Sequence, residues 1–115
     1  MALFKKDLIT LILSDRKTQT RRIHKYGWEV GRTYKIKKYY YDKGQGAILI
    51  TRKFKQRLGD ISEEDAIKEG FATLEEFKKR WIEINHSWEP AQLITAYEFR
   101  LCTKSSAEEP KERLI

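Results

Sequence analysis

Cysteine, proline and methionine are rare in this sequence: one cysteine (Cys102), two prolines and one methionine among 115 residues. A single cysteine excludes an internal disulfide bond and a zinc site built from several cysteines. No apolar run approaches the roughly 20 residues that a helix needs to span a bilayer. The start, MALFKKDLITLILSD, is interrupted by Lys5, Lys6 and Asp7 and has no small-residue cleavage site, so we expect no signal peptide. These absences predict a cytoplasmic protein with no membrane partner.

Acidic residues are scarce in the first half of the chain. Between Arg16 and Arg57 there are 14 Lys/Arg and 2 Asp/Glu, whereas between Leu58 and Phe99 there are 4 and 10. The net charge of +7 therefore includes a basic segment of +12, which is typical of proteins that bind polyanions. The alternative is that folding interleaves the two halves and neutralises them. Abundant lysine and glutamate beside a single asparagine also fit the composition of thermophile proteins.

The apolar pattern predicts a helix and then a long β-hairpin. An apolar stripe at helical spacing indicates a first helix that ends near Ser14, formed by Leu8, Leu11 and Ile12. From Lys17 the chain is expected to be extended, because KTQTRRI has two threonines and no helical stripe. The glycines of KGQG, residues 43–46, accept positive φ and predict the turn of a hairpin over residues 34–58.

Two capping signatures predict a pair of helices after the hairpin. Ser62 with Asp65 three residues later is typical of a capping box, and Gly70 suits the residue that follows the end of this helix. Thr73 with Glu76 is the same signature for a second helix. The expected apolar face of that helix consists of Leu74, Phe77, Trp81 and Ile84.

The last apolar segment completes the predicted fold. QLITAYEFRL, residues 92–101, alternates in a way that is typical of a closing strand. Strands with one helix before them and a helical pair inserted before the last strand predict an α+β fold. A small β-barrel is the expected arrangement, because it leaves few open strand edges. We expect one domain over residues 1–103 and a flexible polar tail over residues 104–115.

The segment SDRKTQTRRIHKYGW places cations and hydroxyls close together. Arginine offers a planar fork for phosphate, and lysine and threonine supply further donors, so the segment predicts an anion site. The alternative is a solvated edge strand guarded by its charges. Tyrosines beside lysines in the hairpin either stack on bases or pack in the barrel, and the pattern leaves both open. The expected nucleic-acid-binding residues are Arg16, Lys17, Arg21, Arg22, Tyr40, Arg52 and Lys53.

The sequence contains no glycine-rich nucleotide loop and no His, Asp or Glu spacing typical of a metal site, so we predict no cofactor and no metal. His24 and His86 are isolated from each other and from other ligands. What remains is Lys17 with its neighbouring threonines and a carboxylate, for which Glu69 is the candidate. A lysine can activate a hydroxyl nucleophile where burial and neighbouring cations lower its pKa.

DRKTQTRR resembles the signature of ASCH domains, Gly-x-Lys-x-x-x-x-Arg, with Lys17 and Arg22 at its charged positions. LGDISEEDAIKEGFATLEEFKKRW is similar to the family's helical block and AYEFRL to its closing strand, so the resemblance covers residues 1–101. It implies a PUA-like β-barrel, a cleft lined by the signature and a role connected with RNA. Asp15 stands where the signature has glycine, and aspartate tolerates a left-handed backbone better than most residues. Its carboxylate would also raise the pKa of Lys17.

Some small ASCH proteins are amidohydrolases that remove the acetyl group from N4-acetylcytidine. The resemblance implies that Lys17, Thr20 and Glu69 correspond to their catalytic residues. We therefore expect a protein that binds RNA or a modified nucleoside in a basic cleft, with such an amidohydrolase as the alternative and a ribonuclease as a third hypothesis. Side chains three apart on a regular strand face opposite ways, so the amidohydrolase requires a backbone bend between Asp15 and Gln19.

Overall fold

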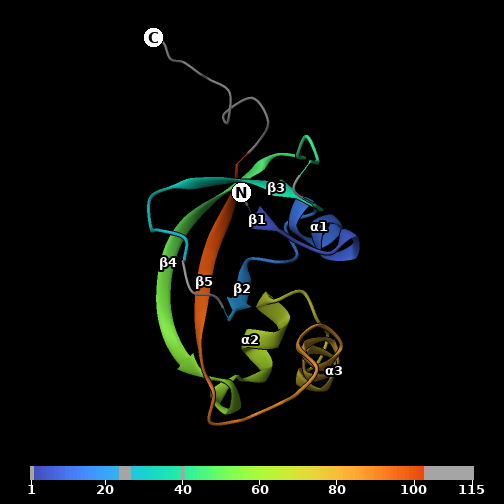
Figure 1. The fold of residues 1–115 in the computed structure, drawn as a ribbon, viewed down its shortest axis with the longest axis vertical. Helices are drawn as coiled ribbons and strands as arrows, with labels where there is room; N and C mark the ends of the chain where they lie inside the picture. The colour runs from blue at the N-terminus through green and yellow to red at the C-terminus, as the bar shows by residue number, and fades with distance from the viewer. Residues whose placement is uncertain (1, 24–26, 40, 103–115) are drawn as a thin grey trace.

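The computed structural model describes residues 2–23, 27–39 and 41–102 (Figure 1). The predictions for His24, Tyr40 and the tail over residues 104–115 lie outside the described residues. The elements are β1 (Ala2–Leu3), α1 (Lys6–Leu13), β2 (Gln19–Arg22), β3 (Thr33–Lys37), β4 (Ala47–Arg57), a short 3-10 helix (Leu58–Asp60), α2 (Glu63–Lys68), α3 (Leu74–Asn85) and β5 (Leu93–Cys102).

The strands form one mixed sheet in the order β1-β3-β4-β5-β2. β1 runs parallel to β3, and the other neighbouring pairs are antiparallel. β4 and β5 pair along their length with one irregularity between Ile50 and Arg52. α2 and α3 lie together beside β2, and α1 lies next to β1 (Figure 1). The predicted α+β class, the hairpin, the first helix and the inserted helical pair are therefore confirmed.

The predicted closure of the sheet into a barrel is wrong. β1 and β2 are the two ends of the sheet, and no backbone ladder joins them within the described residues. The physical reason is that β1 contains only two residues before the chain turns at Lys5 into α1. A side chain spans the gap instead, because Nη2 of Arg22 on β2 donates to the carbonyl oxygen of Leu3 on β1 at 2.6 Å.

A bend between α1 and β2 sets the direction of the basic segment. Asp15 has a φ of 64°, a left-handed conformation that glycine adopts most readily. The backbone N–H of Lys17 then donates to the carbonyl oxygen of Leu11 at 3.1 Å. The N–H of Thr18 donates to the carbonyl oxygen of Lys68, at the end of α2, at 2.8 Å. The chain therefore turns sharply before β2 becomes regular, as the sequence predicted.

Local signals determine the helical pair as predicted. The Ser62 side chain and Asp65 form a complete capping box at the start of α2, and the Thr73 hydroxyl accepts from the N–H of Glu76 at the start of α3. Gly70 follows α2 with a φ of 103°. A Cβ atom at Gly70 would lie 2.9 Å from Cδ1 of Leu11, so both the positive φ and the close approach of this side chain favour glycine here.

Two apolar clusters hold the fold together. One joins the sheet to α1 around Phe4, Ile12, Trp28, Ile36 and Tyr97. The other lies beneath α2 and α3 and contains Leu58, Ala66, Phe77, Trp81 and Ile94. Phe77 and Trp81 are buried as predicted, whereas Ile84 is 41 % exposed, contrary to its predicted place on the buried face of α3. The predicted closing strand, β5, lies between β4 and β2 in the sheet, and its middle is buried on both faces.

Candidate functional site

Glu69 lies at the centre of the candidate site. It is the C-cap residue of α2, and only 3 % of its surface is exposed. Nζ of Lys17 donates to its Oε1 at 2.8 Å and to its backbone carbonyl oxygen at 3.0 Å. Nη1 of Arg21 donates to the other carboxylate oxygen, Oε2, at 2.9 Å. One buried carboxylate therefore binds two buried cations that come from the loop before β2 and from β2 itself.

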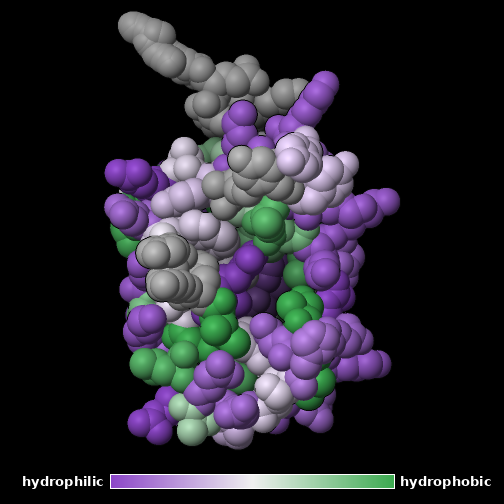
Figure 2. Space-filling model, in the orientation of Figure 1, coloured by the Kyte–Doolittle hydropathy of each residue, from purple (hydrophilic) through white to green (hydrophobic). Residues whose placement is uncertain are grey.

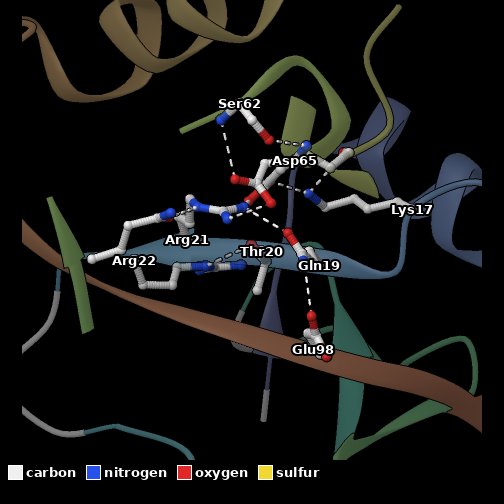
Figure 3. Close-up of polar contacts among 10 residues, drawn as sticks. Lys17, Gln19, Thr20, Arg21, Arg22, Ser62, Asp65 and Glu98 are labelled. Atoms are coloured by element: carbon white, nitrogen blue, oxygen red, sulfur yellow. Dashed lines mark hydrogen bonds and ion pairs between the residues drawn. The ribbon is translucent and has the colours of Figure 1, made fainter. Parts of the chain in front are cut away.

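Neighbouring side chains hold Arg21 in position. Its Nε donates to Gln56 at 2.8 Å, and its Nη1 also donates to Gln19 at 2.9 Å. Gln19 in turn donates to Glu98 at 2.8 Å, and Asp65 lies 3.4 Å from Nη2 of Arg21. Lys17, Arg21 and Asp65 converge on one side of β2 (Figure 3). Because the guanidinium is planar and held by several partners, its orientation toward Glu69 is closely defined.

Burial has a direct effect on the protonation of Lys17. Only 2 % of the residue is exposed, and the loss of hydration lowers the pKa of its ammonium group below the usual 10.5. The Glu69 carboxylate acts in the opposite direction and offsets part of this effect, while Arg22 and Arg21 lower the pKa further. A lysine in these surroundings loses its proton more readily than one in water, which is the property required of a general base.

Thr20 and Arg22 project from the opposite face of β2. Thr20 is buried, and Nε of Arg22 lies 3.5 Å from its hydroxyl oxygen. The Arg22 guanidinium lies over the rings of Phe4 and Trp28, at 4.5 and 5.0 Å from the centroids. Burial lowers the pKa of Arg22 to about 10, so the group stays charged at neutral pH. Arg22 forms an ion pair with no carboxylate among the described residues.

A cavity of about 410 Å³ lies beside β2, and residues from both faces of this strand line it. Its lining includes Lys17, Thr20, Arg21, Arg22 and Glu69. Apolar side chains form much of the remaining wall, chiefly Leu3, Phe4, Leu8, Phe77, Trp81 and Ile84. Figure 2 shows the hollow with hydrophilic residues in its depth and hydrophobic residues at its margin. A group that enters meets charge at the bottom and apolar surface at the sides.

The structure brings some of the sequence-predicted residues together and leaves others apart. Arg16 is exposed and does not line the cavity. Arg52 and Lys53 lie on β4, outside the cavity lining, where Arg52 pairs with Glu98 at 3.4 Å and Lys53 lies over the ring of Tyr97 at 5.8 Å. Tyr40 lies outside the described residues. The basic half of the sequence is thus partly neutralised by the acidic half.

Several residues of the site escaped the sequence analysis. Gln19 and Gln56 hold Arg21, and Lys5 lines the cavity, although none of the three was predicted to belong to the site. Lys38, one of the hairpin lysines beside the tyrosines, also lines the cavity. Asp65 was recognised only as a capping residue, yet it also lies against Arg21. No local pattern marks these residues, because their neighbours in space are distant in the sequence.

Residues 2–23, 27–39 and 41–102 contain neither a metal centre nor a membrane-spanning helix. No group of three or more His, Cys, Asp or Glu side chains there is arranged to hold a metal ion. Within the same residues, no helix has both the length and the apolar character required to cross a membrane.

No protein-family model and no curated protein sequence matches this chain, but solved structures do. An ASCH domain from Lactobacillus crispatus is 18 % identical over 83 % of this chain and 70 % of that one, with a TM-score of 0.61. Protein EF3133 from Enterococcus faecalis, of family DUF984, is 23 % identical over 83 % and 69 %, with a TM-score of 0.60. A point mutant of ZmASCH from Zymomonas mobilis is 12 % identical over 90 % and 73 %, with a TM-score of 0.63. The chain has the ASCH domain fold.

Proposed function

We propose that this protein binds a modified nucleoside, or a single nucleoside unit of RNA, in the cavity beside β2. The observation that carries the proposal is the cavity itself, about 410 Å³ and lined by charged groups together with aromatic and aliphatic side chains. Pockets for small ligands have this size and this mixture of apolar walls with a few fixed polar groups. The ASCH fold, which the sequence resemblance connects with RNA, agrees with a ligand of this class.

The charges of the site favour a small ligand over an extended strand. Lys17 and Arg21 are buried and already bound to Glu69, so they are poor partners for the phosphates of a polymer. A protein that binds RNA through many phosphates loses affinity steeply as salt is added, whereas binding of an uncharged nucleoside is nearly independent of salt. The two modes of binding therefore differ in a quantity that is simple to measure.

Calorimetric titration of the full chain with N4-acetylcytidine, cytidine and a short single-stranded RNA tests the proposal. We expect saturable binding of at least one nucleoside, with little change between low and high salt. Phe77→Ala, which removes part of the apolar wall, should weaken binding, whereas Phe54→Ala outside the cavity should leave it unchanged. Steeply salt-dependent binding of the RNA with no binding of either nucleoside would contradict the proposal.

A second candidate is hydrolysis of the acyl amide of an N4-acylated cytidine. The specific observation in its favour is the bond between the Lys17 ammonium group and the buried Glu69 carboxylate, with the Thr20 hydroxyl in the same cavity. The lowered pKa of Lys17 makes an uncharged amine accessible. Lys17 donates to Glu69 and not to Thr20, so a bound ligand or a water has to bridge these two groups. Such bonds are often incomplete before a ligand binds.

In the proposed reaction, the Thr20 oxygen attacks the carbonyl carbon of the acyl group, and its proton passes through a bridging water to the uncharged Lys17 amine. The bond between this carbon and the exocyclic nitrogen of the base then breaks, and the nitrogen leaves with the proton returned by Lys17. Water attacks the resulting ester on Thr20 and releases the carboxylic acid. Glu69 orients the Lys17 amine throughout, and Arg21 keeps the carboxylate of Glu69 in place.

Turnover of N4-acetylcytidine to cytidine and acetate tests this second candidate. Thr20→Ala should abolish turnover, because no other hydroxyl among the described residues lines the cavity. Thr18→Ala is the matched control, since this half-buried threonine precedes β2 by one residue and does not line the cavity. Activity that survives in Thr20→Ala at the wild-type rate would rule out Thr20 as the nucleophile.

The ribonuclease hypothesis receives no comparable support. No histidine of the described residues lines the cavity, and no group of metal ligands exists among them to activate a water. A cytoplasmic location and a thermophilic source remain predictions from composition.

A further inference from the structure

Positive charge exceeds negative charge in the lining of the cavity. Its cationic residues are Lys5, Lys17, Arg21, Arg22, Lys38 and Arg80. The single acidic residue of the lining, within the described part of the chain, is Glu69. Acids at the border neutralise only some of these cations: Asp65 lies near Arg21, and Asp7 accepts from Arg80 at 2.6 Å. Lys5, Lys38 and Arg22 form no ion pair with any carboxylate of the described residues, so the excess charge resides on these three.

Lys5 and Lys38 lie beyond the ends of two neighbouring strands and line the same cavity. β1 pairs in parallel with β3, with Leu3 opposite Lys37. The N–H of Phe4 extends this ladder by donating to the carbonyl oxygen of Lys37 at 2.9 Å. Lys38 follows Lys37 directly and Lys5 follows Phe4, so both lysines lie just beyond the ends of the two strands. Both side chains are exposed and line the cavity, so they lie at its mouth.

The remainder of the mouth is apolar. Leu3, Ile23 and Ile84 come from three different segments, each is at least 39 % exposed, and all three line the cavity. Exposed apolar side chains around a charged interior suit the faces of a base or a sugar. They do not suit a second phosphate, which would lose its hydration without gaining a partner. The mouth therefore offers one position for an anion, beside an apolar surface.

We infer that the cavity takes a nucleoside 5′-monophosphate, whose phosphate lies between Lys5 and Lys38 while its base points toward Lys17 and Glu69. This inference rests on the proposed function and names the class of ligand within it. A phosphate monoester is a dianion near neutral pH and forms charge-assisted hydrogen bonds with ammonium groups. The charge of Arg22, which no carboxylate of the described residues pairs, adds a favourable field for an anion.

Titration of the full chain with cytidine and with cytidine 5′-monophosphate tests the inference, because neither compound carries an acyl group on N4 that could be hydrolysed. We expect the monophosphate to bind about tenfold more tightly, the factor that corresponds to a single charge-assisted contact. The double variant Lys5→Ala/Lys38→Ala should bring the two affinities close together. Its matched control is Lys6→Ala/Lys35→Ala, which removes the same charge from exposed neighbours that do not line the cavity and should preserve the difference.

Each other outcome has a defined meaning. If cytidine binds and the monophosphate binds no more tightly, the phosphate position is wrong and the nucleoside site stands. If the control variant removes the difference as fully as the double variant does, the effect is one of net charge and the inference fails. Tighter binding of a cytidine trinucleotide than of the monophosphate would mean that the ligand is an RNA strand and not a mononucleotide, and the inference would fail. If no nucleoside or nucleotide binds, the proposed function falls together with the inference.

Discussion

The Lys17 ammonium group lies 2.8 Å from Oε1 of Glu69, although 52 residues separate the two positions in the chain. Arg21 binds the other oxygen of the same carboxylate, so the end of α2 and the start of β2 are joined by a buried group of three charges. Buried charges are costly unless they are paired, and here each depends on the others. The group therefore has consequences for stability as well as for the proposed chemistry.

Glu69→Gln should be strongly destabilising. It leaves Lys17 and Arg21 buried without their shared carboxylate, and removing one partner of a buried ion pair costs about 3–5 kcal/mol. Urea denaturation measures the loss of free energy of unfolding. Glu64→Gln is the control, because Glu64 is exposed on the same helix and should change stability by less than about 0.5 kcal/mol. Equal effects of both variants would mean that the buried pair contributes nothing specific.

The titration of Lys17 should make the free energy of unfolding depend on pH in the alkaline range. The pKa of Lys17 is lowered in the folded state and near 10.5 in the unfolded state. As the pH rises, the folded state therefore releases this proton first. Stability should therefore rise with pH between the lowered pKa and 10.5, and the contribution is lost as pH falls through the lowered pKa. Lys17→Met should remove this part of the slope in denaturation curves at alkaline pH. An unchanged slope in Lys17→Met would show that Lys17 titrates alike in both states.

Trp81→Ala should cost about 3–5 kcal/mol, because Trp81 is buried and packs against Phe77 with ring centroids 6.0 Å apart. Thermal and urea unfolding both measure this loss. Ile82→Ala, one residue further along α3 and 45 % exposed, is the control and should change stability by less than about 1 kcal/mol. A small loss for Trp81→Ala would mean that the indole contributes little to holding α3.

Gly70→Ala should destabilise the fold more than Gly31→Ala. Both glycines have positive φ, and this conformation alone costs an alanine about 1 kcal/mol. At Gly70 the new Cβ atom would also lie 2.9 Å from Leu11, whereas nothing lies within 4 Å at Gly31. The difference between the two variants in unfolding free energy measures the cost of separating α1 from α2. Equal losses would show that Leu11 moves aside without cost.

Local signals in the sequence were sufficient for the helices and the hairpin. These signals are the Ser62 capping box, the Thr73 cap and the positive φ of Gly70. Each involves residues within a few positions of one another, so it can be predicted from the sequence alone. The same holds for the bend at Asp15, where the ASCH signature has glycine. Backbone conformation at such positions depends on the residue itself and its immediate neighbours.

Contacts between distant segments decided what the sequence left open. The sequence left open whether Lys17 and Arg21 bind a polyanion at the surface or belong to a site with Glu69, and the fold buries both against Glu69. The barrel stayed open because β1 ends after two residues, a length that no local pattern marks. Lys5 and Lys38, far apart in the sequence, line one cavity because β1 pairs with β3. Residue types thus determined which chemistry is present, while strand order and helix packing determined which charges are neutralised and which face the cavity.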